Sequence, residues 1–248
     1  MSIVQRLIMG YSGAGGGGGS APDTTVPVLW LDASDSSYYT QTGGKYSSLR
    51  DKNGGLDFVQ ATDAKRPTVD STTFSLNSMA ITTQLNVKAA SKLNAGANFT
   101  CFMVGSTLTG SGSYNQTAIR NGSYTVQTGT DMFGLLGNSS QMACQVGVYE
   151  GNGNVADSFY QTSSYINAST KFLLMASSDG VIRLNRSGVS LSGAITGSLI
   201  VDQIGENSGG ELYLGRGTVG EIIIYDEILG ATERAAVEDY LYAKWGTP

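Results

Sequence analysis

Three carboxylates stand close together near the end of the chain, at Glu221, Asp226 and Glu227. Two carboxyl groups about 5–5.5 Å apart can serve as the acid and the nucleophile of a retaining glycosidase. Side chains alternate between the two faces of a strand, so Glu221 and Asp226 are expected to point in opposite directions. Histidine, the commonest general base, is absent from the sequence. We therefore expect no catalytic residues, and a glycan-active enzyme is the third of our three functional hypotheses.

A second group of oxygen-bearing side chains follows the first apolar segment. Aspartate and asparagine oxygens are typical calcium ligands, and the residues that could supply them are Asp32, Asp35, Asp51, Asn53 and Asp57. The alternative, which we favour, is that Asp32 and Asp35 form turns and caps after a strand. We expect no other cofactor, because a chain without histidine cannot hold zinc through imidazole.

The two cysteines, Cys101 and Cys144, are 43 positions apart. This separation is not a metal-ligand spacing, and it leaves one disulfide as the only cross-link between thiols. No secretory signal accompanies the cysteines, so we expect free buried thiols.

Aromatic side chains offer surfaces on which sugars can stack. Trp30 is expected in a strand and Trp245 on the apolar stripe of a helix, and both places favour core packing. Tyrosines expected on the surface are better candidates for glycan contacts, and they are Tyr38, Tyr39, Tyr114, Tyr160 and Tyr165.

The elements that must position these side chains are short strands. Glycine supplies 34 of the 248 residues and charged residues only 14%, a composition that suits many tight turns. In the first apolar run, Leu29 and Leu31 alternate with Trp30 and Asp32. Turn signals such as Asn53-Gly54 and Asp179-Gly180 separate the runs. The pattern predicts an all-β domain over residues 23–248, a two-sheet antiparallel jelly-roll sandwich, with strands at 28–32, 99–104, 142–148, 171–176, 181–184, 199–204, 211–214 and 219–225.

One α-helix is predicted, at the C-terminal end over residues 230–246. Gly230 can serve as its N-cap, with Glu233 three positions later to reach back to the free amides. Gly246 is placed to end the helix, and its apolar stripe is formed by Val237, Tyr240, Leu241 and Trp245. We expect this helix to lie across the sandwich.

Several segments together resemble the concanavalin A-like, laminin G-like lectin/glucanase domains. They are VLWLDASD at 28–35, LRDKNG at 49–54 with Ala61-Thr62 and Arg66-Pro67 after it, GEIIIYD at 220–226, and Glu233-Arg234, Tyr240-Leu241 and Lys244-Trp245-Gly246. The chain departs from the family at Leu49, where tryptophan is frequent, and at Gly230, where serine is frequent. The resemblance implies a two-sheet jelly roll used for adhesion to glycans or proteins, in secreted and virion proteins. It does not imply catalysis, because the clustered carboxylates of the family's glucanases have no counterpart here.

The N-terminal segment, residues 1–22, differs from the rest of the chain. Its apolar side chains are Ile3, Val4, Leu7, Ile8 and Met9, and a glycine-rich tether follows at 15–20. The apolar run is too short and too interrupted for a signal peptide, and the glycines lack the strand and helix that would make them a phosphate-binding loop. We expect this arm to dock on a neighbouring subunit, and the alternative is that it packs on its own domain.

The charge and the arm together lead to the functional prediction. The net charge is −5, and no stretch of the sequence collects lysine or arginine into a cluster. We therefore expect no nucleic-acid partner. No apolar run is long enough to span a membrane. The leading hypothesis is a non-enzymatic virion structural protein of a bacteriophage, on the virion surface as a capsid decoration, fibre or tail adhesion component. Its partners would be capsid or tail subunits and host surface polysaccharide, with a homotrimer as the expected oligomer. The second hypothesis is a free or cell-surface carbohydrate-binding module.

Overall fold

The computed structural model describes residues 25–81, 85–107, 115–120, 132–137, 141–148, 158–167, 170–189, 195–205, 214–215 and 217–248. The predicted N-terminal arm, with Ile3, Val4, Leu7, Ile8 and Met9, lies outside the described residues, and so does Tyr114.

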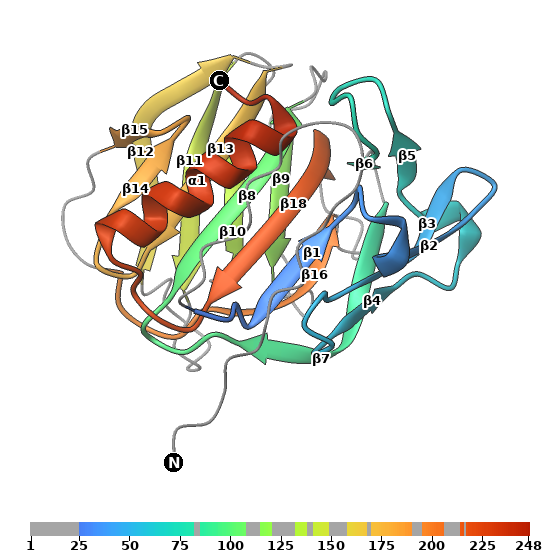
Figure 1. Ribbon diagram of the computed structural model, residues 1–248, viewed down its shortest axis with the longest axis horizontal. Coiled ribbons are helices and arrows are strands. Elements are labelled where there is room, and N and C mark those ends of the chain that lie inside the picture. The colour runs from blue at the N-terminus through green and yellow to red at the C-terminus, as the bar shows by residue number, and fades with distance from the viewer. Residues whose placement is uncertain are drawn as a thin grey trace.

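Short strands dominate the described part of the chain, as the glycine-rich composition predicted (Figure 1). The two short 3-10 helices are η1 (Ser36–Tyr38) and η2 (Asp63–Lys65), and the α-helix is α1 (Ala231–Trp245). The strands are β1 (Leu29–Asp32), β2 (Tyr39–Thr42), β3 (Lys45–Arg50), β4 (Asp57–Val59), β5 (Thr68–Asp70), β6 (Ser78–Ile81), β7 (Asn86–Asn94), β8 (Thr100–Thr107), β9 (Asn115–Arg120), β10 (Met132–Gly137), β11 (Gln141–Val148), β12 (Ser158–Asn167), β13 (Lys171–Ser177), β14 (Ile182–Leu184), β15 (Ser187–Val189), β16 (Ile200–Gly205), β17 (Leu214–Gly215) and β18 (Gly217–Tyr225).

The strands form two layers of a sandwich, which confirms the predicted all-β fold. The first layer has the order β1-β18-β8-β13-β14-β15, and every neighbouring pair in it is antiparallel. The second layer runs β2-β3-β4-β7-β16-β9-β10-β11-β12, with every neighbouring pair antiparallel, and the two-residue β17 pairs in parallel with β9. Strands β5 and β6 connect the two layers, because β6 pairs with β18 and β5 touches β3.

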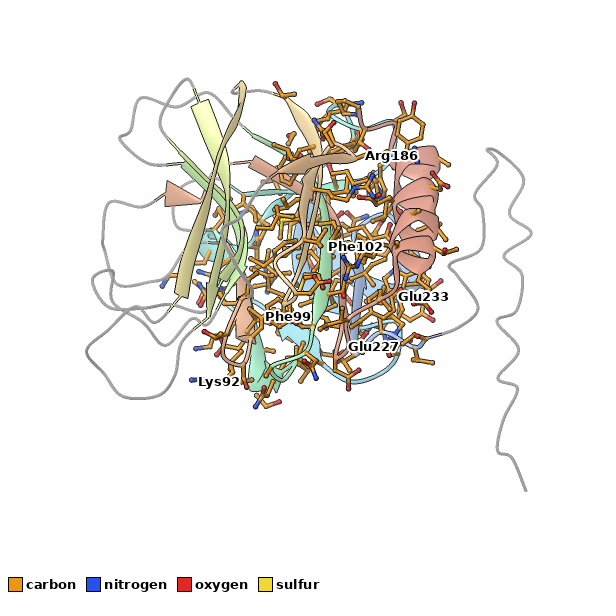
Figure 2. The ribbon with its side chains drawn as sticks, turned by 90° about the vertical axis from the view of Figure 1, so that its left-hand side faces the viewer. Lys92, Phe99, Phe102, Arg186, Glu227 and Glu233 are labelled. Atoms are coloured by element: carbon orange, nitrogen blue, oxygen red, sulfur yellow. The ribbon has the colours of Figure 1, made fainter. Side chains whose placement is uncertain are left out.

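Two apolar clusters lie on opposite faces of the first layer. One fills the space between the two sheets and includes Leu29 and Leu31 of β1. The other lies between the first layer and α1, and Trp30 packs against it. The alternation read from the sequence of this strand is therefore confirmed. Figure 2 shows Phe102 of β8 between its sheet and the helix, where that second cluster lies.

Helix α1 covers the outer face of the first layer, as predicted (Figure 1). The backbone N–H of Gly230 donates to Glu233 Oε2 at 2.8 Å, so the predicted N-terminal cap is present. Gly246 has a left-handed φ of 58°, which glycine adopts without steric cost, and it ends the helix. On the inner side, Val237, Leu241 and Trp245 are buried. Among the described helices none is long and apolar enough to cross a membrane.

Cys101 is a free, fully buried thiol on β8, as the sequence predicted. Burial raises the pKa of this thiol well above its usual value. Cys144 lies on β11 opposite Leu135 of β10.

Candidate functional site

The strongest concentration of polar side chains inside the described part of the fold lies beneath α1. Its centre is Glu221 of β18, whose Cα pairs with that of Asp32 on β1. Directly opposite residues in an antiparallel pair share a face of the sheet, so both carboxylates point toward the helix. Their exposed fractions are 0% for Glu221 and 1% for Asp32.

A β-bulge at Gly220 is the reason that Glu221 points this way. Along β18, Val219 pairs with Gly105 of β8, but the next pair is Glu221 with Val104, which leaves Gly220 as the extra residue. Val219 thus packs in the core between the sheets, while Glu221, only two positions later, faces the helix. Without the bulge both side chains would share one face.

The carboxylate of Glu221 accepts four hydrogen bonds. Oε1 accepts from the indole N–H of Trp30 at 2.6 Å and from the hydroxyl of Tyr240 at 2.9 Å. Oε2 accepts from the indole N–H of Trp245 at 2.7 Å and from Lys244 Nζ at 2.8 Å. A carboxylate has about four lone-pair sites, so every acceptor site of Glu221 is in use.

Two lysines neutralise the neighbouring Asp32. Lys244 Nζ lies 2.5 Å from Asp32 Oδ2, and Lys52 Nζ lies 3.2 Å from the same oxygen. Lys52 also pairs with Asp35 at 2.9 Å. The other oxygen of Asp32 accepts from the backbone N–H and the hydroxyl of Ser34, at 3.0 and 2.7 Å. Strand β1, the loop after β3 and helix α1 are thus joined by one ionic network.

The two carboxyl groups have opposite pKa shifts. Burial acts to raise the pKa of Asp32, but the charges of Lys244 and Lys52 outweigh it and hold that pKa below its usual value. Burial and the negative charge of Asp32 together raise the pKa of Glu221, against the attraction of Lys244. The hydrogen bond and ion pairs of Lys52 outweigh its burial and raise its pKa.

Aromatic rings enclose the network. Trp30 and Tyr240 meet edge to face at a centroid distance of 6.2 Å, and Phe74 and Trp245 do so at 5.2 Å. Lys52 Nζ lies 4.8 Å from the centroid of the Trp30 ring, within the range of a cation–π contact. The predicted core position of Trp245 is confirmed, with 2% of it exposed, while Trp30 is half-buried.

The carboxylates considered as catalytic acids lie apart in the structure, as predicted. Glu221 is fully buried under the helix, whereas Asp226 and Glu227 are exposed beyond the end of β18. Figure 2 shows Glu227 at the end of the sheet, below the start of the helix. These three residues therefore do not form one catalytic group.

The candidate calcium ligands are divided among separate contacts. Asp35 caps η1 by accepting from Ser37 N at 3.1 Å, which confirms the alternative prediction of a cap. Asp51 accepts from the backbone N–H groups of Trp30, Asn53 and Gly55. The Asn53 amide donates to Pro27 O, and Asp57 is exposed. Within the described residues, no three carboxylate or thiol side chains are grouped to hold a metal ion. Calcium binding stays a prediction.

One tyrosine predicted to be exposed is buried. Tyr39 has an exposed fraction of 8%, because its ring packs edge to face on Tyr46 and its hydroxyl accepts from Asn77. It is the first residue of β2, directly after η1, and the sequence gives no sign of which side of that short element faces the core. The expectation that it could reach a glycan is therefore wrong.

Of the other tyrosine candidates, the structure describes the side chain of Tyr38 alone. Tyr38 is half-buried beside Lys52, whose Nζ lies 5.3 Å from its ring centroid. On β12, Tyr160 pairs with Val146 and Tyr165 with Ala143 of β11. The side chains of these two tyrosines lie outside those that the structure describes, so their contact with a glycan stays a prediction.

Sequence reasoning missed the two lysines and the role of Glu221. One signal was available: Tyr240 and Lys244 are four positions apart, so they lie on one side of a helix. Trp30 and Asp32 similarly share a face of β1. What the sequence lacked was any sign that these two faces meet over Glu221.

The comparison with known proteins identifies a fold but no family by sequence. No protein-family profile and no curated protein matches this chain. Among solved structures, the chain is similar to Trypanosoma rangeli sialidase in complex with 2,3-difluorosialic acid, with a TM-score of 0.58 and 14% identity over 91% of this chain. It is also similar to the receptor binding domain of botulinum neurotoxin type G, with a TM-score of 0.51 and 13% identity over 90% of this chain. The ligand binding domain of the serotype D neurotoxin, in complex with N-acetylneuraminic acid, gives a TM-score of 0.54 at 11% identity over 90%.

These likenesses concern the fold alone. The chain spans 34% of the sialidase and 54% of each toxin domain. At 11–14% identity among the sialidase and toxin structures named, the shared property is a β-sandwich architecture.

Proposed function

We propose that this protein is a non-catalytic virion structural protein of a bacteriophage, with an outward sandwich of lectin-like fold. The observation that supports its non-catalytic character is the state of Glu221. This residue is the most deeply buried carboxylate of the described part, and all its acceptor sites are taken by Trp30, Tyr240, Trp245 and Lys244. Because Glu221 is 0% exposed, a polysaccharide substrate cannot reach this carboxylate from solvent.

The N-terminal segment supports attachment to a larger assembly. Residues 1–22 join an apolar stretch to a glycine-rich tether, a design that suits docking on another subunit while the domain stays free to project outward. The partners in this proposal are capsid or tail subunits, and the location is the virion surface.

The attachment is tested by co-sedimentation with particles depleted of this protein. Full-length protein should sediment with the particles, and a variant carrying Leu7→Asp and Ile8→Asp should stay in the supernatant. A matched control, Thr24→Asp and Thr25→Asp, adds the same charge beyond the tether and should bind normally. Equal binding by all three proteins would contradict anchoring through the arm.

A second candidate function is carbohydrate binding. It is favoured by the fold comparison, in which one neighbour is described with a sialic-acid derivative and another with N-acetylneuraminic acid. The full chain would then bind a sialylated oligosaccharide such as sialyllactose without any particle. Ligand-observed NMR with sialyllactose and with lactose as control distinguishes this function, and absence of binding at millimolar ligand would rule out this glycan class.

Enzymatic action on glycans is the third alternative. It predicts product release from polysaccharide and loss of that release in Glu221→Gln. We expect no release by the wild-type protein, and detectable release that Glu221→Gln abolishes would overturn the non-catalytic proposal.

A further inference from the structure

An amine and a carboxyl group from opposite ends of the domain are in direct contact in the buried network. Lys244 of α1 and Asp32 of β1 are 212 positions apart in sequence, yet Nζ lies 2.5 Å from Oδ2. The side chain of Asp32 is 2% exposed and that of Lys244 is 17% exposed. A second carboxyl group, of Glu221, contacts the same nitrogen at 2.8 Å and is 0% exposed.

We propose that Lys244 and Asp32 are joined by an intramolecular isopeptide bond, formed autocatalytically after folding with Glu221 as the proton-transfer group. The site holds the three groups that such a condensation needs: a nucleophilic amine, an acyl carbon, and an acid–base residue that touches the amine. The cross-link would exist whether or not the protein belongs to a virion.

The reaction balances without any co-reactant. Glu221 transfers one proton from the Lys244 ammonium to Oδ2 of Asp32, which leaves a neutral amine beside a neutral carboxylic acid. The lone pair of Nζ then attacks Cγ of that acid to form the new C–N bond. Glu221 transfers a second proton from the nitrogen to Oδ2, the Cγ–Oδ2 bond breaks, and Oδ2 leaves as water. The ammonium supplies both protons of that water, and Glu221 ends in the protonation state in which it began. The products are one neutral amide and one water molecule.

Asp32 rather than Glu221 is the acyl partner because its two oxygens have different surroundings. Oδ1 accepts from the backbone N–H and the hydroxyl of Ser34, two donors that can stabilise negative charge on that oxygen in the tetrahedral intermediate. Among the described residues, Oδ2 contacts the cations Lys244 and Lys52, which favour its departure. Both oxygens of Glu221, by contrast, are fixed by the two indoles and Tyr240.

The surroundings favour condensation over the ion pair. Two buried charges are costly because each loses its hydration, whereas a neutral amide loses much less. Trp30, Tyr240 and Trp245 cover the network and limit the return of water. Folding holds the reacting groups together, which removes most of the entropic cost of a bimolecular amide synthesis. The raised pKa of Glu221 also suits a group that must carry protons in this site.

The bond would fasten the helix to the sheet. Lys244 lies in the last turn of α1 and Asp32 at the end of β1, so the cross-link would close a loop that contains most of the domain. A covalent closure of that length restricts the unfolded chain and opposes forced separation of the two ends.

Mass spectrometry of the purified full-length protein, denatured before measurement, tests the bond directly. We expect a mass lower than the sequence mass by one water molecule. Trypsin should release a branched peptide in which residues 7–45 are joined to residues 235–248, with no cleavage after Lys244. A full-mass protein with separate peptides would overturn the proposal, and so would water loss on a single unbranched peptide, which indicates a succinimide.

Two variants test the assigned roles. Lys244→Arg keeps the positive charge but lacks the nucleophile, and it should show the full mass. Glu221→Gln should form the bond about a hundredfold more slowly during refolding, since acid–base catalysis typically contributes at least that factor. Lys45→Arg, at an exposed ion pair with Asp63, is the control and should be cross-linked like the wild type. Wild-type cross-linking at an unchanged rate in Glu221→Gln would overturn the role of Glu221, and the wild-type peptide map decides the bond itself even if a variant does not fold.

Discussion

Replacement of Gly220 by alanine should damage the network without touching any polar group in it. A Cβ built at Gly220 lies 2.8–2.9 Å from three ring carbons of Trp245. The ring cannot simply move aside, because its N–H donates to Glu221 at 2.7 Å and it packs edge to face with Phe74. The backbone of Gly220 has no left-handed φ, so the steric contact with the ring is the whole effect.

The loss of stability can be worked from two contributions. Overpacking of a well-packed site costs about 1–3 kcal/mol, and weakening a hydrogen bond to a charged group costs about 1.5–3 kcal/mol. The ring can relieve part of the overpacking by shifting, and that shift weakens its hydrogen bond, so the two costs do not add in full. We expect a total loss of about 3 kcal/mol in the free energy of unfolding. For a protein of this length that corresponds to a fall in Tm of about 6–12 °C.

Gly188→Ala is the matched control. A Cβ at Gly188 meets nothing within 4 Å, and this glycine also has no left-handed φ. Both substitutions remove the same glycine flexibility from the unfolded chain, so the difference between the variants isolates the contact with Trp245. Chemical denaturation followed by tryptophan fluorescence measures it. Equal stability of the two variants would refute the reasoning that Gly220 is fixed by the indole.

Three further predictions concern single side chains. Glu238 is 1% exposed and accepts no hydrogen bond from any described residue, although Arg183 Nη1 lies 3.3 Å away. Burial raises the pKa of Glu238 against the attraction of Arg183 and Arg186. A raised folded-state pKa means that the folded protein holds its proton more tightly, so this residue lowers stability as pH rises through that pKa. Glu238→Gln should therefore raise the free energy of unfolding by about 1 kcal/mol over the wild type at pH 7. This difference should vanish toward pH 4. A difference between the two urea midpoints that stays constant across pH would contradict this. Asp51→Ala removes the acceptor of three backbone amides and should lower the free energy of unfolding by about 3 kcal/mol. The control Asp57→Ala, at an exposed position, should change it by no more than about 0.5 kcal/mol. Similar losses of stability in both variants would argue against the amide contacts. In a Cys144→Ser background, Cys101 should react with iodoacetamide only after denaturant is added, because its thiol is fully buried, and rapid labelling of the native protein would disprove that burial.

The sequence alone predicted those features that depend on short-range patterns. The alternation of Leu29, Trp30 and Leu31 predicted a strand with two different faces, and both faces proved to be packed. Glycine at 230 and 246, with Glu233 three positions after the first, predicted the ends of α1. Such features are local, since the backbone geometry of a strand or a helix end is decided by a few neighbouring residues.

What only the tertiary structure decided is the meeting of distant residues. The bulge at Gly220 reverses the side on which Glu221 lies, and no local pattern in β18 predicts it. Tyr39 was expected at the surface but is buried, because its short strand packs its ring on Tyr46. Lys52, Lys244, Asp32 and Glu221 come from four segments, and each looks like an ordinary polar residue in its own segment. Their chemistry arises only where sheet register and helix docking bring them together, because the removal of water there is a property of the whole fold.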